Sequence, residues 1–102
     1  MKIQAEAIHF PIDAELLSST QQKVSKLERF FNRISEARII FKYEHLGQKQ
    51  ERVAEVKIHL PNGIIFIKEN SKTFEAALDK ALVGLKLLLL RHKAKRLGYS
   101  LT

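Results

Sequence analysis

The stretch RVAEVKIHLPNGIIFIKE, residues 52–69, contains two strand-like segments on either side of a turn. In residues 52–60 apolar and polar side chains alternate, which is typical of a strand with one buried face. Pro61, Asn62 and Gly63 form a strong turn signal, and residues 64–69 are rich in the β-branched residues that strands favour. The stretch therefore predicts an antiparallel hairpin. In the first strand of the hairpin, the side chains that are expected to face the core are Ala54, Val56, Ile58 and Leu60. Those of Glu55, Lys57 and His59 are expected to face solvent.

Two more strands are predicted on the N-terminal side of this hairpin. Residues 36–45 place apolar side chains at alternate positions, and the polar residues 46–50 predict the connection to the hairpin. Residues 2–8 also alternate, and Pro11 ends that segment. The chain thus contains four predicted strands, each except perhaps the last with one apolar face.

Two amphipathic helices complete the prediction. The first begins after Asp13, a suitable N-cap, and continues to about Arg33, and the second runs from about residue 72 to 96 with Ser71 as its cap. Apolar side chains of the first helix recur at helical spacing on one stripe. That stripe contains Leu16, Thr20, Val24, Leu27, Phe31 and Ile34.

The element order β-α-β-β-β-α predicts an α+β fold with a four-stranded sheet. The last three strands should form an antiparallel meander, and a right-handed crossover should place the first strand beside the second in parallel. Because the strands have one apolar face, both helices are expected on the same side of the sheet.

The second helix carries more apolar residues than one buried stripe can use. Its core stripe is predicted to contain Phe74, Ala77, Leu78, Ala81, Leu85, Leu88 and His92, with Leu82 and Leu89 flanking it. Val83, Leu87 and Leu90 project roughly opposite, where no core is obvious. Such a stripe often marks contact with another molecule, although packing within an oligomer would also explain it. We do not expect it to bind a membrane, because the second stripe is too narrow for stable insertion.

Length and composition favour one domain over residues 1–102, with a short tail at 97–102. Of the 102 residues 45% are hydrophobic and none is cysteine, which argues against disorder and against disulfide or cysteine–zinc frameworks. We find neither a signal peptide nor a run of the roughly 20 apolar residues needed to cross a bilayer. A cytoplasmic location is therefore the default expectation.

The net charge is +7, and most of it lies in the second half of the chain. Residues 1–51 hold eight bases and seven acids, whereas residues 52–102 hold ten bases and four acids. Asp79 is the last acidic residue. This asymmetry indicates a polyanionic partner, most often a nucleic acid, although a solubilising surface is an equally good explanation of charge alone.

Nothing in the sequence favours catalysis. The histidines at 9, 45, 59 and 92 have no metal-ligand spacing, and we find neither a glycine-rich phosphate loop nor a nucleophile motif. We therefore expect no enzyme activity, metal, cofactor or small-molecule substrate. The aromatic residues mostly fall on the apolar faces, so any RNA should be bound by cations on the helices and not by base stacking.

Specific segments resemble the ribosome hibernation promoting factor family, also called ribosome-associated inhibitor or sigma-54 modulation protein. MKIQAEAIHF (1–10) followed by VSKLERFFNRI (24–34) resembles the amino-terminal half of that family. VAEVKIHLPNG (53–63) resembles its third strand and turn, and SKTFEAALDKALVGLKLLLLRHKAK (71–95) resembles its second helix.

The resemblance implies a fold like the double-stranded-RNA-binding domain and binding to 16S rRNA of the small ribosomal subunit, where messenger and transfer RNA would lie. Members of the family silence idle ribosomes in stress or stationary phase. Long members of the family carry an additional C-terminal dimerisation domain. Because these 102 residues are too few to contain it, the chain is expected to resemble the short form. The implied mechanism is steric exclusion.

The candidate RNA-binding residues combine the family's basic positions with the basic edges of the second helix. They are Lys23, Lys26, Arg29, Arg33, Lys80, Lys86, Arg91, Lys93, Lys95 and Arg96. The chain departs from the family pattern at Ile8, Leu87 and Leu90, where bases are common, and at Leu88, where glutamine is common. Two other hypotheses remain for Val83, Leu87 and Leu90: contact with a protein such as a transcription factor, and weak self-association.

Overall fold

The computed structural model describes the backbone of residues 1–96 and the side chains through His92, except that of Leu46. The predicted tail at 97–102 and the side chains of Lys93, Lys95 and Arg96 lie outside the described residues. The elements in chain order are β1 (Lys2–Ala7), α1 (Ala14–Ser25), α2 (Leu27–Phe30), β2 (Glu36–Leu46), β3 (Lys49–Leu60), β4 (Gly63–Ser71) and α3 (Phe74–Arg96).

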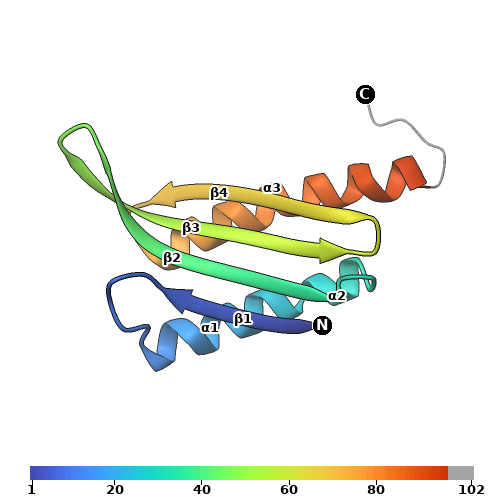
Figure 1. The fold of residues 1–102 in the computed structure, drawn as a ribbon, viewed down its shortest axis with the longest axis horizontal. Coiled ribbons are helices and arrows are strands. Elements are labelled where there is room, and N and C mark those ends of the chain that lie inside the picture. Colours follow the sequence, from blue (N-terminus) through green and yellow to red (C-terminus); the bar gives the residue numbers. More distant parts are fainter. Residues whose placement is uncertain (97–102) are drawn as a thin grey trace.

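The four strands form one sheet in the order β1-β2-β3-β4, as predicted (Figure 1). β1 pairs with β2 in parallel, and the other two pairs are antiparallel. Ile39, Val56 and Ile67 are partners across β2, β3 and β4, so the inward-facing residues of the meander are in register. The connection between β2 and β3 is shorter than the predicted polar segment 46–50, because β3 begins at Lys49.

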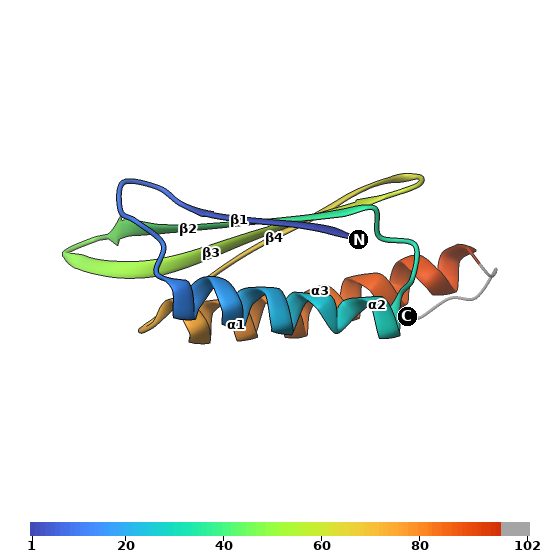
Figure 2. The ribbon, with the colours of Figure 1, turned by 90° about the horizontal axis from the view of Figure 1, so that it is seen from below.

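The three helices form a second layer on one face of the sheet (Figure 2). α1 and α3 lie side by side and run in the same direction. Between the layers lies a core built from the alternating side chains of the strands and one stripe of each long helix. Its buried polar side chain is Thr20, whose hydroxyl donates to the Leu16 carbonyl at 2.7 Å. The predicted α+β architecture is confirmed.

The first helical segment is shorter than predicted and is divided at Lys26. Its start is confirmed, since an Asp13 carboxylate oxygen accepts from the Leu16 N–H at 2.6 Å. α2 ends at Phe30, and Phe31 adopts an extended conformation with φ −151° and ψ 106°. Phe31 and Ile34 are nevertheless both buried. The chain leaves the helix to bring both side chains into the core, so Arg33 lies in a loop and not on the helix.

The cap of the last helix is Thr73, and the predicted cap Ser71 is wrong. The Thr73 hydroxyl accepts from the Ala76 N–H at 3.0 Å, and α3 begins at Phe74. Ser71 is the last residue of β4 and pairs with Arg52. The strand continues further than its polar end suggested, because β3 offers backbone partners up to that point.

α3 buries its predicted stripe with one exchange of leucines. Leu89 is fully buried and Leu88 is half-buried. The sequence predicted Leu88 in the core stripe and Leu89 at its flank. α3 packs against α1 as well as the sheet, which turns the buried face toward Leu89. His92 is half-buried, and its ring meets that of Phe31 edge to face at a centroid distance of 5.9 Å.

Four aromatic rings pack together at the end of the sheet where β1 leads into α1. The Phe74 ring lies 5.0–5.5 Å from the rings of Phe10, Phe41 and Tyr43. Phe66 has no aromatic partner among the described residues: it projects from the opposite face of the sheet and is 52% exposed. Residues 64–69 lack alternation, so the sequence did not reveal which of their side chains face solvent.

The contrast between Phe74 and Phe66 gives a prediction about stability. Phe74→Ala should lower the free energy of unfolding by about 3–5 kcal/mol, because it removes a buried ring and leaves a cavity. Phe66→Ala, the same chemical change at an exposed site, should cost less than about 1 kcal/mol. Urea unfolding followed by circular dichroism measures both. Equal losses would contradict the assignment of the two faces.

Candidate nucleic-acid interface

A basic groove lies between α1 and α3 on the side of the helices that faces away from the sheet. It has a volume of about 360 Å³ and is lined by Lys23, Lys26, Leu27, Asp79, Leu82, Val83 and Lys86. Leu27 and Leu82 are buried and form its floor, while Lys26 and Lys86 are exposed. Three ammonium groups therefore face one carboxylate, so the groove has a surplus of positive charge.

One of the three groove lysines is paired within the protein. The Lys23 ammonium lies 2.9 Å from an Asp79 carboxylate oxygen, and this ion pair joins α1 to α3. Among the described residues, no ion pair involves Lys26 or Lys86. These two lysines are therefore the groove cations that are available to an external anion.

The predicted arginines extend this basic surface past the groove. Arg29 lies on α2 and is exposed, and Arg33 is exposed in the loop that follows. Both come after Lys26 in the chain at the end of the first helical segment. Both residues therefore lie outside the lining of the groove, Arg29 on the short helix that follows α1 and Arg33 in the next loop.

Lys80 and Arg91 lie on the other side of α3. The Lys80 ammonium donates to the Asn70 carbonyl at 2.9 Å and is 3.9 Å from a Glu69 carboxylate oxygen, so it is bound to the edge strand β4. Arg91 is eleven residues further along α3, close to three full turns, and therefore shares that side of the helix. The predicted cations consequently form two rows and not one patch.

Between the two rows runs a ridge of three exposed apolar side chains. Val83 is 63% exposed, Leu87 57% and Leu90 42%. The prediction that these residues find no place in the core is confirmed. We refer to Val83, Leu87 and Leu90 as the α3 ridge.

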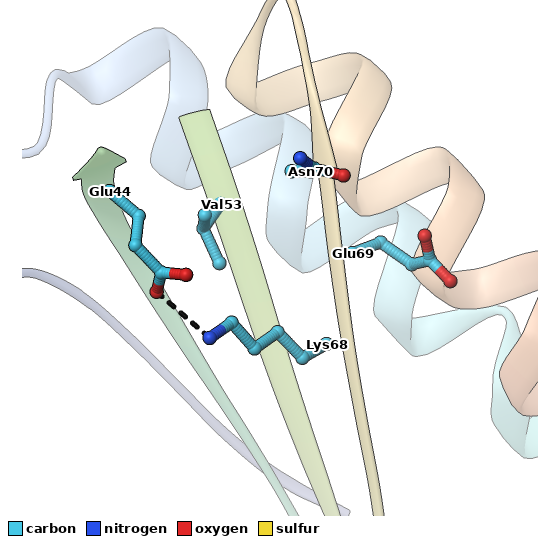
Figure 3. A pocket seen from close by; sticks show the side chains of 5 residues that line it. All are labelled: Glu44, Val53, Lys68, Glu69 and Asn70. Carbon is cyan, nitrogen blue, oxygen red and sulfur yellow. Dashed lines mark ion pairs between the residues drawn. The ribbon is translucent and has the colours of Figure 1, made fainter. Parts of the chain in front are cut away.

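The open face of the sheet has a different electrostatic character. The Lys42 ammonium lies 2.8 Å from a Glu55 carboxylate oxygen. The Lys68 ammonium lies 2.8 Å from a Glu44 carboxylate oxygen, and Figure 3 shows this second pair. The hydrogen bond from Lys68 lowers the pKa of Glu44, and the hydrogen bond to Glu55 raises the pKa of Lys42. Because these charges neutralise each other, the hollow beside Val53 in Figure 3 offers no surplus charge to an anion.

The sequence did not single out a second pair of cations on the same open face. Arg38 and Lys57 are directly opposite each other on β2 and β3, and Phe66 is the next residue across on β4. Arg38 donates to the Gln4 side chain at 3.2 Å and lies 3.8 Å from Glu36. The alternation of residues 36–45 and 52–60 contained this information, since it places both side chains outward.

The protein thus has a four-stranded sheet, two long helices on one side of it and a basic groove between those helices. These features define its class as a small α+β protein with a cationic helical face. The chain belongs to the family described as sigma 54 modulation protein / S30EA ribosomal protein, whose sequence profile matches residues 3–97.

Relatives agree with this membership, and solved structures share the fold. The chain is 34% identical over 73 residues to the ribosome hibernation promoting factor of Klebsiella oxytoca, covering 72% of this chain and 73% of that protein. It is 26% identical over 97 residues to the factor of Azotobacter vinelandii, covering 95% and 87%. A ribosomal subunit interface protein from Coxiella burnetii has the same fold, with a TM-score of 0.80, 22% identity and coverage of 92% of this chain and 99% of that one. The N-terminal domain of Thermus thermophilus Protein Y matches at a TM-score of 0.75 and 22% identity, covering 90% and 99%.

None of the helices in the described part of the chain has both the length and the apolar character that spanning a membrane requires.

The ion pairs of the open face predict a pH effect on stability. The folded-state pKa of Glu44 lies below its unfolded value, so its contribution is present above the unfolded pKa and is lost as the pH falls through the folded pKa. Glu44→Gln should therefore reduce the difference in unfolding free energy between neutral and acidic pH. Urea unfolding at a series of pH values measures this difference. As a control, Glu75→Gln removes an exposed acid elsewhere and should change this pH-dependent difference less. Equal changes in the two variants would contradict the role of Lys68.

Proposed function

We propose that this protein is a ribosome-associated hibernation factor, which acts in the cytoplasm by binding the small ribosomal subunit and has no enzymatic activity. Membership in the family and the names of its relatives support the ribosome-associated role. The single observation that carries the site of binding is the groove between α1 and α3, where Lys26 and Lys86 face outward beside a ligand-sized hollow.

The groove suits the phosphate backbone of folded RNA. Cations project from two parallel helices, so a phosphate backbone lying along the groove would meet ammonium groups from both sides. Arg29 and Arg33 would extend the contact beyond the groove. Such contacts position the protein on a fixed RNA shape and read little sequence. They also release counterions, so affinity should fall steeply with salt.

Inhibition would follow from occupancy alone. A protein bound to 16S rRNA in the channel used by messenger and transfer RNA excludes both by volume, and this requires no cofactor and no chemical step. The fold supports this mode, because the helical layer can contact RNA while the sheet behind it keeps the two helices at a fixed spacing.

The decisive experiment is cosedimentation with small ribosomal subunits across a salt series. The triple variant Lys26→Glu, Arg29→Glu, Lys86→Glu should lose affinity by on the order of a thousandfold, given about 1.5–3 kcal/mol for each hydrogen bond to a charged group. The slope of log affinity against log salt should become shallower by about 0.7–0.9 per lost phosphate contact.

A matched control reverses three charges on the opposite face of the molecule. Lys2, Arg38 and Lys57 project from the open face of the sheet, and their reversal changes the net charge equally. This control should retain most of the affinity. Equal losses in the two triple variants would contradict the groove and leave only non-specific charge.

Asp79 offers a prediction with the opposite sign. Asp79→Asn removes the carboxylate that pairs with Lys23, so the groove gains an available ammonium group and binding should tighten by several-fold, with a steeper salt dependence. Glu75→Gln removes the same charge from the same helix outside the groove and should have a smaller effect. Weaker binding by Asp79→Asn, in a variant that unfolds at the same urea concentration, would argue against a phosphate strand in the groove.

A further inference from the structure

The α3 ridge has the spacing of a helix-packing seam. Val83, Leu87 and Leu90 are separated by four and then three residues, which is the pattern of core positions in a coiled coil. They lie on the side of α3 opposite the buried residues Ala81, Leu85 and Leu89, so nothing in the described part of the chain covers them. The described residues thus leave a second seam on α3 without a partner.

The flanking residues determine which partner fits this seam. In the heptad that places Val83 and Leu90 at d and Leu87 at a, Lys86 is a g residue and Arg91 an e residue. These positions face the charged edges of a docked helix. Both are basic, and the described part of α3 has no acidic residue after Asp79.

This charge pattern selects against two occupants. A second copy of α3 would bring basic edges against basic edges, and like charges at these positions disfavour pairing. A phosphate backbone would be attracted by the edges, but it would gain nothing from three apolar side chains between them. A helix that is apolar on one face and acidic along both edges of that face would pack against the apolar seam and also pair with the basic e and g residues.

We propose that the α3 ridge is a docking surface for an acidic amphipathic helix of a partner protein. The partner would pack apolar a and d residues against Val83, Leu87 and Leu90, and its e and g carboxylates would meet Lys86 and Arg91. The proposal goes beyond ribosome binding, and the docking surface shares Val83 and Lys86 with the basic groove.

The test uses the full chain and a labelled synthetic peptide of three heptads with leucine at a and d and glutamate at e and g. Fluorescence anisotropy should show saturable binding of this peptide and much weaker binding of a counterpart with lysine at e and g. Leu87→Ser should weaken binding of the glutamate peptide at least about tenfold, because it removes one buried leucine contact. Ile64→Ser is the matched control, since Ile64 is 58% exposed on the open sheet face and Leu87 is 57% exposed; it should leave binding unchanged.

A second variant tests the charge rule directly. Lys86→Glu with Arg91→Glu should reverse the preference, so that the lysine peptide binds more tightly than the glutamate peptide. Both variants replace exposed side chains, and their urea unfolding curves check that the fold is retained.

Three results would overturn the proposal. Equal binding of the glutamate peptide by the native chain and by Leu87→Ser would show that the ridge makes no contact. Self-association of the native chain in sedimentation that Leu87→Ser abolishes would assign the ridge to a second copy. Loss of small-subunit binding in Leu87→Ser as large as in Lys86→Glu would assign it to the RNA interface.

Discussion

The structure depends on the burial of a single apolar sheet face. In β1, β2 and β3 the core side chains recur at every second position, so one face of the sheet carries most of the apolar surface, and both long helices cover it. Two helices packed on one face necessarily lie beside each other, and a groove with two rows of outward side chains follows from that placement. The basic groove is therefore a consequence of how the core is covered.

Strand positions, strand pairing and the side of the helices could be predicted from alternation and turn signals alone. The two-residue turn at Pro61 and Asn62 and the Asp13 cap are local features that the sequence revealed, whereas the cap of the last helix was placed at Ser71 and is Thr73. The end of the first helix was not revealed, because Phe31 and Ile34 continue the helical stripe in sequence while reaching the core from an extended backbone. The spacing of apolar residues does not show whether a segment keeps its helical hydrogen bonds or leaves the helix to bury its side chains in the core.

The candidate site was predicted only as a set of residue types. Periodicity placed Lys80 and Lys86 on opposite edges of the helix, but it could not show that Lys80 is held by the Asn70 carbonyl or that Lys23 is held by Asp79. Those contacts join residues far apart in sequence, and they decide which cations remain available. The exposure of Val83, Leu87 and Leu90, in contrast, followed from the helical wheel, because a helix has only one side that faces the sheet.

The parallel pairing of β1 has a consequence for the order in which the chain folds. Lys2 pairs with Glu36, whereas the two antiparallel pairs close through short turns at Gly47 and Asn62. Contacts between neighbours in sequence require less loop-closure entropy, so the β2–β4 meander should form before β1 docks on it. During synthesis β1 leaves the exit tunnel before the other three strands and has no backbone partner until residue 36 and its successors emerge. The earliest of the four strands to be made is thus expected to be the last to join the sheet.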